Sequence, residues 1–290
     1  MQIDRFLLQR LRDLSVEAAD ALWVHKEGKT PDRDPILINQ EIHGLRPQID
    51  AILQSSPHLS AQDFVRYALK IGAITFVPTE LKSGRLSPYF FNAGLFNTGE
   101  SISGLAGAFA SAMTAEPMAE FDPVFDKIVV FGPAYKGISI VTAVAMALYK
   151  NYGINVGYAF NRKEEKDHGE GGRTVGHPLK GRGVIITDDT MTTGGSCADA
   201  FRIVRQEGGN PIGCVIAFDR EERGTDSALS AVQTFEQEYG IRMTTAATLT
   251  DLITVLQEDG PAIPNGSEIL AKILDYRNQY GGHQIAHHSH

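Results

Sequence analysis

The spacing of apolar residues sets the N-terminal part of the chain apart from the rest. Residues 3 to about 26 carry apolar side chains at intervals of three and four, which predicts an amphipathic helix. A breaker-rich stretch follows over 28–35, and another short helix is expected over about 45–54. We therefore predict that residues 1–60 form a helical extension, whose apolar stripe packs on the core, extends a subunit interface or binds a third partner.

A second helix start opens the main domain. Ser60 is suited to cap a helix, Asp63 suits the positive end of that helix, and Gly72 is a natural stop. We expect the main domain to span residues 61–278 and residues 279–290 to form a flexible tail.

Beyond Gly72 the pattern changes. Phe76-Val77 and residues 89–91 flank a turn at 82–85, which predicts two paired strands. A long polar loop is expected from 161 to about 180. The other expected strands cover 127–131, 155–160, 184–187 and 212–218, and the expected helices cover 100–115, 137–150 and 196–207. This alternation predicts an α/β fold with a central, mainly parallel sheet whose two faces are covered by helices.

One loop after a predicted strand carries candidate chemistry. The apolar run 184–187 leads into segment 188–196, which reads DDTMTTGGS, and ligands of parallel sheets bind at such carboxyl ends. Neighbouring strand residues point to opposite faces, so both acids reach one ligand only if the chain bends there. The glycines allow close backbone approach, and amides of a helix's first turn bind phosphate. The segment favours a phosphorylated sugar; the alternative is a surface turn in which Ser196 caps the next helix.

Composition narrows the class of protein. With 290 residues, of which 42% are apolar and 21% charged, the chain can bury one sizeable core. The net charge of −8 argues against a protein that coats nucleic acid. Cys197 and Cys214 lie in no metal-binding pattern, so we expect two reduced, packed thiols, as in a reducing cytosol. Without a recognisable signal peptide or membrane-spanning run, we expect a cytoplasmic protein with neither a membrane nor a nucleic acid as partner.

Segment 188–196 resembles the diphosphoribosyl-binding signature of type I phosphoribosyltransferases. In that family the two acids hold the ribose 2- and 3-hydroxyls, and the loop holds the 5-phosphate. The acidic pair, Thr192 and Gly194 match the signature. Three positions depart from the commonest members, namely Thr190, Thr193 and Gly195. The resemblance implies the type I phosphoribosyltransferase fold, in which a small β hood lies beside the central sheet.

Four further segments resemble the orotate phosphoribosyltransferases of this family. They correspond to the hood that holds the orotate ring (about 73–99), the pyrophosphate-binding loop (131–137), the catalytic lid (about 161–173) and a loop whose arginine pairs with the orotate carboxylate (219–224). The resemblance covers roughly residues 62–275. The order and spacing of these motifs point to orotate as the substrate.

The resemblance implies a role for each matching residue. The catalytic residues that it implies are Lys166, Arg162, His168 and Asp189. Contacts with phosphoribosyl pyrophosphate are implied for Lys82, Tyr135, Lys136, Arg162, Lys163, Lys166, His168, Asp188, Asp189, Thr190, Met191, Thr192, Thr193, Gly194, Gly195 and Ser196. Contacts with orotate are implied for Lys82, Phe90, Phe91, Thr192 and Arg220.

The implied reaction joins N1 of orotate to C1 of phosphoribosyl pyrophosphate and releases pyrophosphate, giving orotidine 5'-monophosphate for UMP synthesis. The implied cofactor is Mg²⁺, held mainly by the substrate, with Asp188 and Asp189 reached through water. The resemblance also implies a homodimer in which lid residues enter the neighbouring subunit's site.

Several of these residues also have plainer interpretations. Lys136 could be a surface lysine, but a cation at a helix start opposes the helix dipole and so favours a nearby anion. Arg220 could pair with one of the two glutamates that follow it. Of Phe90 and Phe91, alternation places at most one ring in the core. The lid segment has balanced charges and could be a solvated loop, although its glycines suit a mobile lid.

Two other functions remain open from the sequence. The first is phosphoribosyl transfer to another base, such as a purine. The hood and Arg220 argue against it. The second is a non-catalytic regulator that senses phosphoribosyl pyrophosphate and binds nucleic acid. Residues 1–60 hold no basic excess, which disfavours it. A fused decarboxylase is excluded, because a barrel needs about 250 residues of its own.

Overall fold

The computed structural model describes residues 34, 40–41, 59–81, 83–115, 127–166, 172–191, 195–224 and 227–282. The helices predicted over 3–26 and 45–54 lie outside these ranges. Helix α3 begins at Ala61, where the main domain was predicted to start.

A six-stranded sheet forms the centre of the main domain. Its order is β10-β9-β8-β5-β6-β7, and neighbouring strands run parallel except β7, which pairs antiparallel with β6. The strands are β5 (Ile128–Gly132), β6 (Gly157–Lys166), β7 (Gly172–Gly176), β8 (Gly183–Thr190), β9 (Asn210–Asp219) and β10 (Arg242–Thr248). The predicted central, mainly parallel sheet is confirmed.

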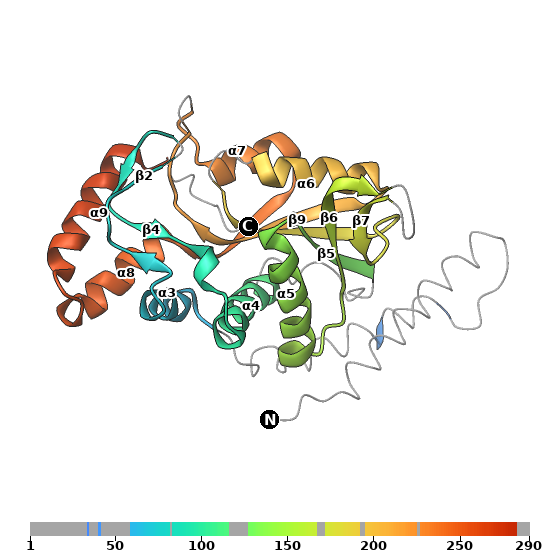
Figure 1. Ribbon diagram of the computed structural model, residues 1–290, viewed down its shortest axis with the longest axis horizontal. Helices are drawn as coiled ribbons and strands as arrows, with labels where there is room; N and C mark the ends of the chain where they lie inside the picture. Colours follow the sequence, from blue (N-terminus) through green and yellow to red (C-terminus); the bar gives the residue numbers. More distant parts are fainter. Residues whose placement is uncertain are drawn as a thin grey trace.

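Helices cover both faces of the sheet, with α6 and α7 above the strands and α3, α4 and α5 below them in Figure 1. One core cluster contains side chains of α3 (Ala61–Lys70), α4 (Gly99–Thr114), α5 (Lys136–Tyr152), α8 (Leu249–Asp259) and α9 (Gly266–Tyr280). The other contains side chains of α6 (Gly195–Gln206) and α7 (Ala231–Tyr239). In β8, Ile185 lies in the first cluster and Val184 and Ile186 in the second, so the strand is apolar on both faces.

Helix α3 begins and ends where its sequence predicts. The Ser60 hydroxyl oxygen accepts a hydrogen bond of 3.1 Å from the backbone N–H of Asp63. Gly72 follows the helix with a φ of 73°, a conformation that glycine adopts at little cost. Between these ends, Phe64 and Val65 are buried in the larger core cluster, so the capped helix is held by its apolar face.

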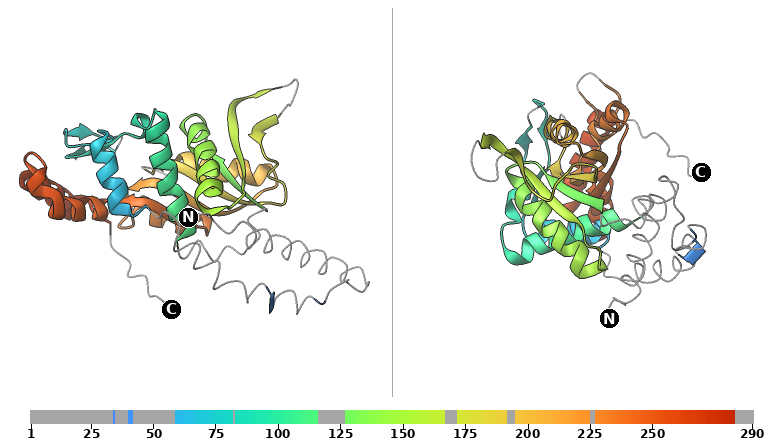
Figure 2. Two further views of the ribbon diagram at one scale, coloured as in Figure 1. Left: turned by 90° about the horizontal axis from the view of Figure 1, so that it is seen from below. Right: turned by 90° about the vertical axis from the view of Figure 1, so that its right-hand side faces the viewer.

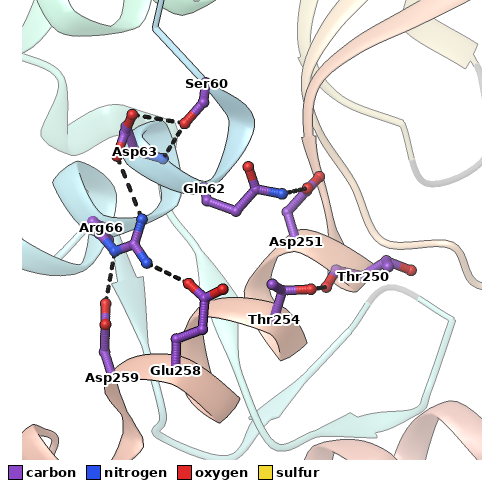
Figure 3. Close-up of polar contacts among 9 residues, drawn as sticks. All are labelled: Ser60, Gln62, Asp63, Arg66, Thr250, Asp251, Thr254, Glu258 and Asp259. Carbon is purple, nitrogen blue, oxygen red and sulfur yellow. Dashed lines mark hydrogen bonds and ion pairs between the residues drawn. The ribbon is translucent and has the colours of Figure 1, made fainter.

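Polar contacts fasten the outer side of α3 to α8 (Figure 3). The Arg66 guanidinium forms ion pairs of 2.6 Å with Glu258 and 2.7 Å with Asp259. The Gln62 amide donates a hydrogen bond of 2.7 Å to Asp251. Partly exposed ion pairs of this kind contribute about 0–1 kcal/mol each, so they orient the two helices more than they stabilise the fold.

The hood consists of two short antiparallel pairs of strands. The pairs are β1 (Ile74–Thr75) with β4 (Phe90–Phe91), and β2 (Thr79–Glu80) with β3 (Leu86–Ser87).

One hood strand begins two residues before its predicted position. The prediction at Phe76-Val77 is wrong, because Ile74 pairs with Phe91 and is buried, whereas Val77 is largely exposed. The predicted turn is confirmed by a backbone hydrogen bond of 2.9 Å from Leu81 N–H to the Arg85 carbonyl.

The segment predicted as a long polar loop contains two strands. Strand β6 continues to Lys166, and β7 pairs with it, with Asn161 opposite Thr174. The prediction of a loop over 161–180 is therefore wrong for the flanks of the lid. The two strands form an arm, residues 161–166 and 172–176, whose backbone N–H and C=O groups are satisfied by pairing without burial of the side chains. Its polar sequence therefore does not reveal the strands. Figure 2 shows the arm extending from the sheet on the same side as the hood.

The end of the main domain lies beyond its predicted position. Helix α9 continues to Tyr280, and Gly281 forms an isolated bridge with Glu222. The Gly282 N–H donates a hydrogen bond of 2.9 Å to the Glu221 carbonyl. Part of the predicted tail therefore belongs to the fold, and its remaining residues, 283–290, lie outside the described ranges.

We expect Gly132→Ala to lower the free energy of unfolding by about 1–3 kcal/mol, the usual cost of overpacking. A β-carbon on Gly132 would overlap the carbonyl oxygen of Gly137 at the junction of β5 and α5. Urea unfolding of both proteins measures the difference. Gly107→Ala is the control, because a β-carbon there meets nothing within 4 Å; it should be neutral or stabilise α4 by about 0.5–1 kcal/mol. Equal stability of both variants would contradict this packing.

Candidate active site

Three predicted site segments meet at one edge of the sheet. Strands β5, β8 and β9 are parallel neighbours, with Phe131 opposite Ile186 and Thr190 opposite Phe218. The segments 131–137, 188–196 and 219–224 lie at the carboxyl ends of these strands. Because parallel strands end at a common edge, the sheet brings the three segments together.

Segment 131–137 connects β5 to α5 through a close backbone contact. Gly132 and Gly137 approach so closely that a β-carbon on either would overlap backbone atoms of the other. The peptide between Ala134 and Tyr135 is cis, and Tyr135 is 69% exposed. The segment therefore presents backbone and an exposed ring at the sheet edge.

The first strand of the lid is attached to this segment. The Ala134 N–H donates a hydrogen bond of 2.9 Å to the side-chain oxygen of Asn161. The Lys163 ammonium lies 4.8 Å from the centre of the Tyr135 ring, within the range of a cation–π interaction. Tyr135 and Lys163, which are both predicted to bind phosphoribosyl pyrophosphate, are thus in contact. The supporting role of Asn161 was not predicted, because nothing local in the sequence identifies its partner.

Lys136 joins two of the predicted loops. Its ammonium nitrogen lies 2.8 Å from Oδ2 of Asp189, although Lys136 is at the first position of α5 and its side chain is 61% exposed. The anion expected beside this lysine is therefore found, and in this structure it is a carboxylate of the protein. The contact places segments 131–137 and 188–196 side by side.

The two acids of segment 188–196 contact different helices. Asp188 Oδ1 accepts a hydrogen bond from the Asp189 N–H, and Asp189 Oδ1 accepts one from the Thr190 N–H, both of 2.9 Å. Asp188 Oδ2 lies 3.8 Å from the Cys197 sulfur in α6, whereas Asp189 faces Lys136 in α5. Strand β8 continues to Thr190, so both acids lie in the last residues of the strand and not in the loop that follows it.

Burial changes the protonation chemistry of this edge. Desolvation raises the pKa of Asp188 to about 6, and the neighbouring charge of Asp189 acts in the same direction. Hydrogen bonds from the Ser196 hydroxyl and the Asp189 amide act against this shift. Burial also raises the pKa of Asp219, at the end of β9, to about 6. The site thus holds two carboxyls that accept protons more readily than exposed ones.

Both cysteines lie beneath the acidic segment. They are buried and free, as predicted, with their sulfur atoms 3.6 Å apart. The Cys214 contact and burial raise the pKa of the Cys197 thiol well above its ordinary range. Cys197 is therefore a neutral thiol, able to donate a weak hydrogen bond to Asp188.

The rest of segment 188–196 divides between core and surface. The Met191 side chain is buried in the smaller core cluster, which leaves its backbone for a ligand. Helix α6 begins at Gly195, so Ser196 lies inside its first turn and is not the cap of the alternative interpretation. Gly195 and Ser196 are exposed at this helix N-terminus, where backbone amides suit an anion. Thr192, Thr193 and Gly194 lie outside the described residues.

The two hood phenylalanines separate as strand alternation predicts. Phe91 is buried and stacks on Phe218 of β9 with ring centres 5.3 Å apart. Phe90 is 37% exposed on the other side of β4. Only one ring is therefore in the core, and the other remains available at the hood surface.

Arg220 lies buried at the base of the hood. Its Nε donates a hydrogen bond of 2.7 Å to Glu222, and its Nη2 donates one of 2.8 Å to the Ser87 hydroxyl. Its guanidinium carbon lies 4.3 Å from the centre of the Tyr89 ring. The pairing with a following glutamate thus occurs, and Ser87 and Tyr89 are contacts that the sequence did not identify.

A pocket of about 410 Å³ adjoins these segments. It lies between η1 (Ala93–Leu95) and the first turns of α4 and α5, and Asn97, Ser139 and Lys136 contribute to its lining. Its position beside Lys136 makes it a neighbour of segment 131–137 and not of Arg220.

Several predicted site residues lie outside the description. These are Lys82 in the hood turn, His168 in the lid, and the side chain of Lys166 at the end of β6. Arg162 lies on β6 between Asn161 and Lys163, at the base of the lid.

Comparisons with known proteins agree with this geometry. A family model described as phosphoribosyl transferase domain matches residues 120–261. The orotate phosphoribosyltransferase of Bordetella parapertussis is 47% identical over 229 residues, covering 77% of this chain and 97% of that protein. That of Nitrosococcus oceani is 44% identical, covering 77% and 96%. The chain belongs to the orotate phosphoribosyltransferase family.

The fold of this family is also seen in a solved relative. The crystal structure of the orotate phosphoribosyltransferase of Francisella tularensis matches with a TM-score of 0.64 at 33% identity. The match covers 76% of this chain and 99% of that one. The expected type I phosphoribosyltransferase fold is therefore confirmed.

We expect Asp188→Asn to stabilise the fold at pH 8 but less so at pH 5. The folded-state pKa of about 6 exceeds the ordinary 3.8, so ionisation of Asp188 opposes folding as the pH rises through this range. The gain at pH 8 should be about 1–3 kcal/mol, at about 1.4 kcal/mol per pKa unit. Urea unfolding at both pH values measures it.

The control is Asp199→Asn, because Asp199 is an exposed acid of α6, the helix that follows the acidic segment. It should change the unfolding free energy by less than about 0.5 kcal/mol. If Asp188→Asn shifted stability equally at pH 5 and pH 8, the desolvation of Asp188 would be contradicted.

Proposed function

We propose that this chain transfers the phosphoribosyl group of 5-phosphoribosyl 1-pyrophosphate to N1 of orotate, giving orotidine 5'-monophosphate and pyrophosphate in pyrimidine biosynthesis. The observation that carries this proposal is the contact between Lys136 and Asp189, 2.8 Å long. It joins the segment assigned to the pyrophosphate with the segment assigned to the ribose phosphate. Family membership supplies orotate as the acceptor.

The phosphoribosyl donor, 5-phosphoribosyl 1-pyrophosphate, is assigned to the sheet edge formed by the carboxyl ends of β5 and β8. We assign the 5-phosphate to the N-terminus of α6, where Gly195 and Ser196 are exposed and helix amides and dipole favour an anion. Asp189 is the more accessible of the two acids and suits a ribose hydroxyl, while Asp188 is buried beneath it. The pyrophosphate is assigned to Tyr135 and Lys136.

Orotate is assigned to the hood and to segment 219–224, which follows β9. Phe90 presents an exposed ring at the hood surface, and Arg220 supplies the positive charge for the orotate carboxylate. Lys82 and Thr192 complete the assigned acceptor site from segments that the structure does not describe. These assignments place the acceptor across the edge from Lys136.

The chemical step requires stabilisation of the leaving group. The bond from C1 to the pyrophosphate oxygen breaks early, so the ribose becomes oxocarbenium-like and negative charge grows on pyrophosphate. We assign the neutralisation of this charge to Arg162, Lys163, Lys166 and His168 of the lid. The contact of Lys163 with Tyr135 supports this, because it already holds the base of the lid against the pyrophosphate segment.

Mg²⁺ is the proposed cofactor, and the residues present fit it. Magnesium prefers oxygen ligands and keeps several waters, so two acids can contact it through water while the substrate chelates it. Asp189 offers a partly exposed carboxylate at the edge, with Asp188 beside it. When bound, the ion neutralises part of the negative charge of the pyrophosphate group.

A homodimer in the cytoplasm is proposed as the working form, with lid residues shared between subunits. Its support is the exposure of large side chains on two elements, Met146 and Tyr149 on α5 and Tyr158 on β6. The two free, buried thiols suit a reducing compartment. No helix in the described part of the chain is long and apolar enough to cross a membrane.

Orotate consumption is the direct test of this function. We expect activity with orotate, phosphoribosyl pyrophosphate and Mg²⁺ together, and loss of activity when any one is omitted or Mg²⁺ is chelated. Uracil, adenine and hypoxanthine should not replace orotate at comparable rates. Equal turnover of a purine base would contradict the assigned acceptor, and turnover without Mg²⁺ would contradict the assigned cofactor.

We expect Lys166→Ala to lower kcat about 10²–10³-fold, the usual effect of removing one preorganised charge-stabilising group. The KM for orotate should rise far less, because the lysine is assigned to the leaving group. Steady-state kinetics separates the two effects. Lys272→Ala is the control, since this lysine is exposed on α9 and pairs with Glu268. An unchanged kcat in Lys166→Ala would remove Lys166 from the mechanism.

A further inference from the structure

Glu222 lies between two arginines from different parts of the chain. Its Oε1 accepts a hydrogen bond of 2.7 Å from Nε of Arg220 and forms an ion pair of 2.7 Å with Nη2 of the same guanidinium. Its Oε2 lies 3.3 Å from Nη1 of Arg85. The side chains of Glu222 and Arg85 are each 12% exposed and that of Arg220 is 7% exposed. The carboxylate is therefore shared between a hood residue and a residue that follows β9.

Arg85 is itself held by the loop that contains Glu222. Its Nη1 donates a hydrogen bond of 2.8 Å to the Arg223 carbonyl, and its Nη2 donates one of 3.3 Å to the Gly224 carbonyl. Its guanidinium also lies 4.9 Å from the centre of the Tyr280 ring, at the end of α9. The turn between β2 and β3 is thus attached to segment 219–224 by several bonds.

These contacts restrict how Arg220 can meet a ligand. Glu222 engages Nε and Nη2, the Ser87 hydroxyl accepts from Nη2, and the Tyr89 ring covers one face of the guanidinium. None of the described hydrogen bonds of Arg220 involves Nη1. An incoming carboxylate would therefore meet the edge that carries Nη1, and Glu222 sets the direction of that edge.

The charge of the group also suits an anionic ligand. Two guanidinium groups and one carboxylate leave a net charge of one positive unit in a nearly buried location. Desolvated charge without a partner is unfavourable, so a ligand carboxylate would complete the neutralisation. The nearby Glu221 carboxylate does not do so in this structure, because it accepts hydrogen bonds from the backbone and hydroxyl of Thr250.

We propose that Glu222 is a positioning residue for orotate recognition: it fixes the Arg220 guanidinium toward the substrate carboxylate and, through Arg85, makes that orientation depend on the hood. This inference rests on the proposed function, in which Arg220 meets orotate. Glu222 touches neither substrate in this account. Its effect is confined to the acceptor side of the reaction, because the donor segments lie on β5 and β8.

The test compares Glu222→Gln, Arg85→Gln and Arg220→Lys in steady-state kinetics with orotate and phosphoribosyl pyrophosphate varied in turn. We expect Glu222→Gln to raise the KM for orotate about tenfold or more, since hydrogen bonds between charged groups are strong. The KM for phosphoribosyl pyrophosphate should remain within about twofold. Arg85→Gln should shift the orotate KM in the same direction by a smaller factor. Glu222→Asp should restore part of the loss.

The matched control is Glu258→Gln. Glu258 also binds an arginine, Arg66, at 2.6 Å, but on the outer side of α3 and α8 (Figure 3). Both KM values should be unchanged in this variant. Thermal unfolding of every variant identifies loss of fold, and if Glu222→Gln does not fold, Arg85→Gln decides the question.

The outcomes separate this inference from the function on which it rests. If Arg220→Lys leaves the orotate KM unchanged, the assignment of Arg220 to orotate fails and the positioning role fails with it. If Arg220→Lys raises that KM but folded Glu222→Gln and Arg85→Gln do not, only the positioning role is overturned. Equal increases in both KM values would also overturn it, because they indicate general loss of structure.

Discussion

Parallel pairing of β5, β8 and β9 is the constraint on which the site depends. Parallel strands must end at the same edge, so the backbone hydrogen bonds of the sheet decide that segments 131–137, 188–196 and 219–224 become neighbours. The ion pair between Lys136 and Asp189 is the direct result, because it joins residues 53 positions apart. The apolar side chains of these strands are buried and stabilise the sheet. The polar residues that follow them therefore lie at the edge of the sheet.

Charges at this edge are accommodated in two different ways. Asp188 is buried beside a second acid, and its pKa rises to about 6 because desolvation disfavours its ionised form. Arg220 is equally buried but remains charged, because Glu222 and the Tyr89 ring provide partners. The first arrangement reduces stability at neutral pH, whereas the second fixes a geometry. Both are typical of positions where ligand binding and stability compete.

Sequence patterns predicted those features of the fold that depend on residues close to one another in the chain. The cap at Ser60 follows from a side-chain hydrogen bond to a backbone N–H of the first helical turn. The separation of Phe90 from Phe91 and the apolar strands of the sheet follow from side-chain burial with a fixed period. The lid part of β6, residues 161–166, and β7 could not be predicted in this way, because backbone pairing holds these strands together and their sequence is mostly polar. The hood strand at 74–75 was misplaced because its position depends on contact with Phe91, which follows 17 residues after Ile74.

The candidate site likewise contains residues that could be predicted from the sequence and residues that could not. Resemblance supplied the donor and acceptor residues, and the structure brings Tyr135, Lys163, Lys136 and Asp189 into contact. Asn161, Ser87 and Arg85 were missed as partners, because their role arises from residues far along the chain. Arg85 and Glu222, for example, are separated by 137 positions. No periodic or motif signal reports such pairs, since each is set by the meeting of the hood with the edge of the sheet.

The most direct test of this account is a crystal structure of the chain with orotidine 5'-monophosphate, which contains both halves of the proposed site in one molecule. The account predicts its phosphate at the N-terminus of α6, its ribose hydroxyls facing Asp189, and its carboxylate against Arg220. A phosphate bound away from segment 188–196, or a carboxylate that does not meet Arg220, would contradict it.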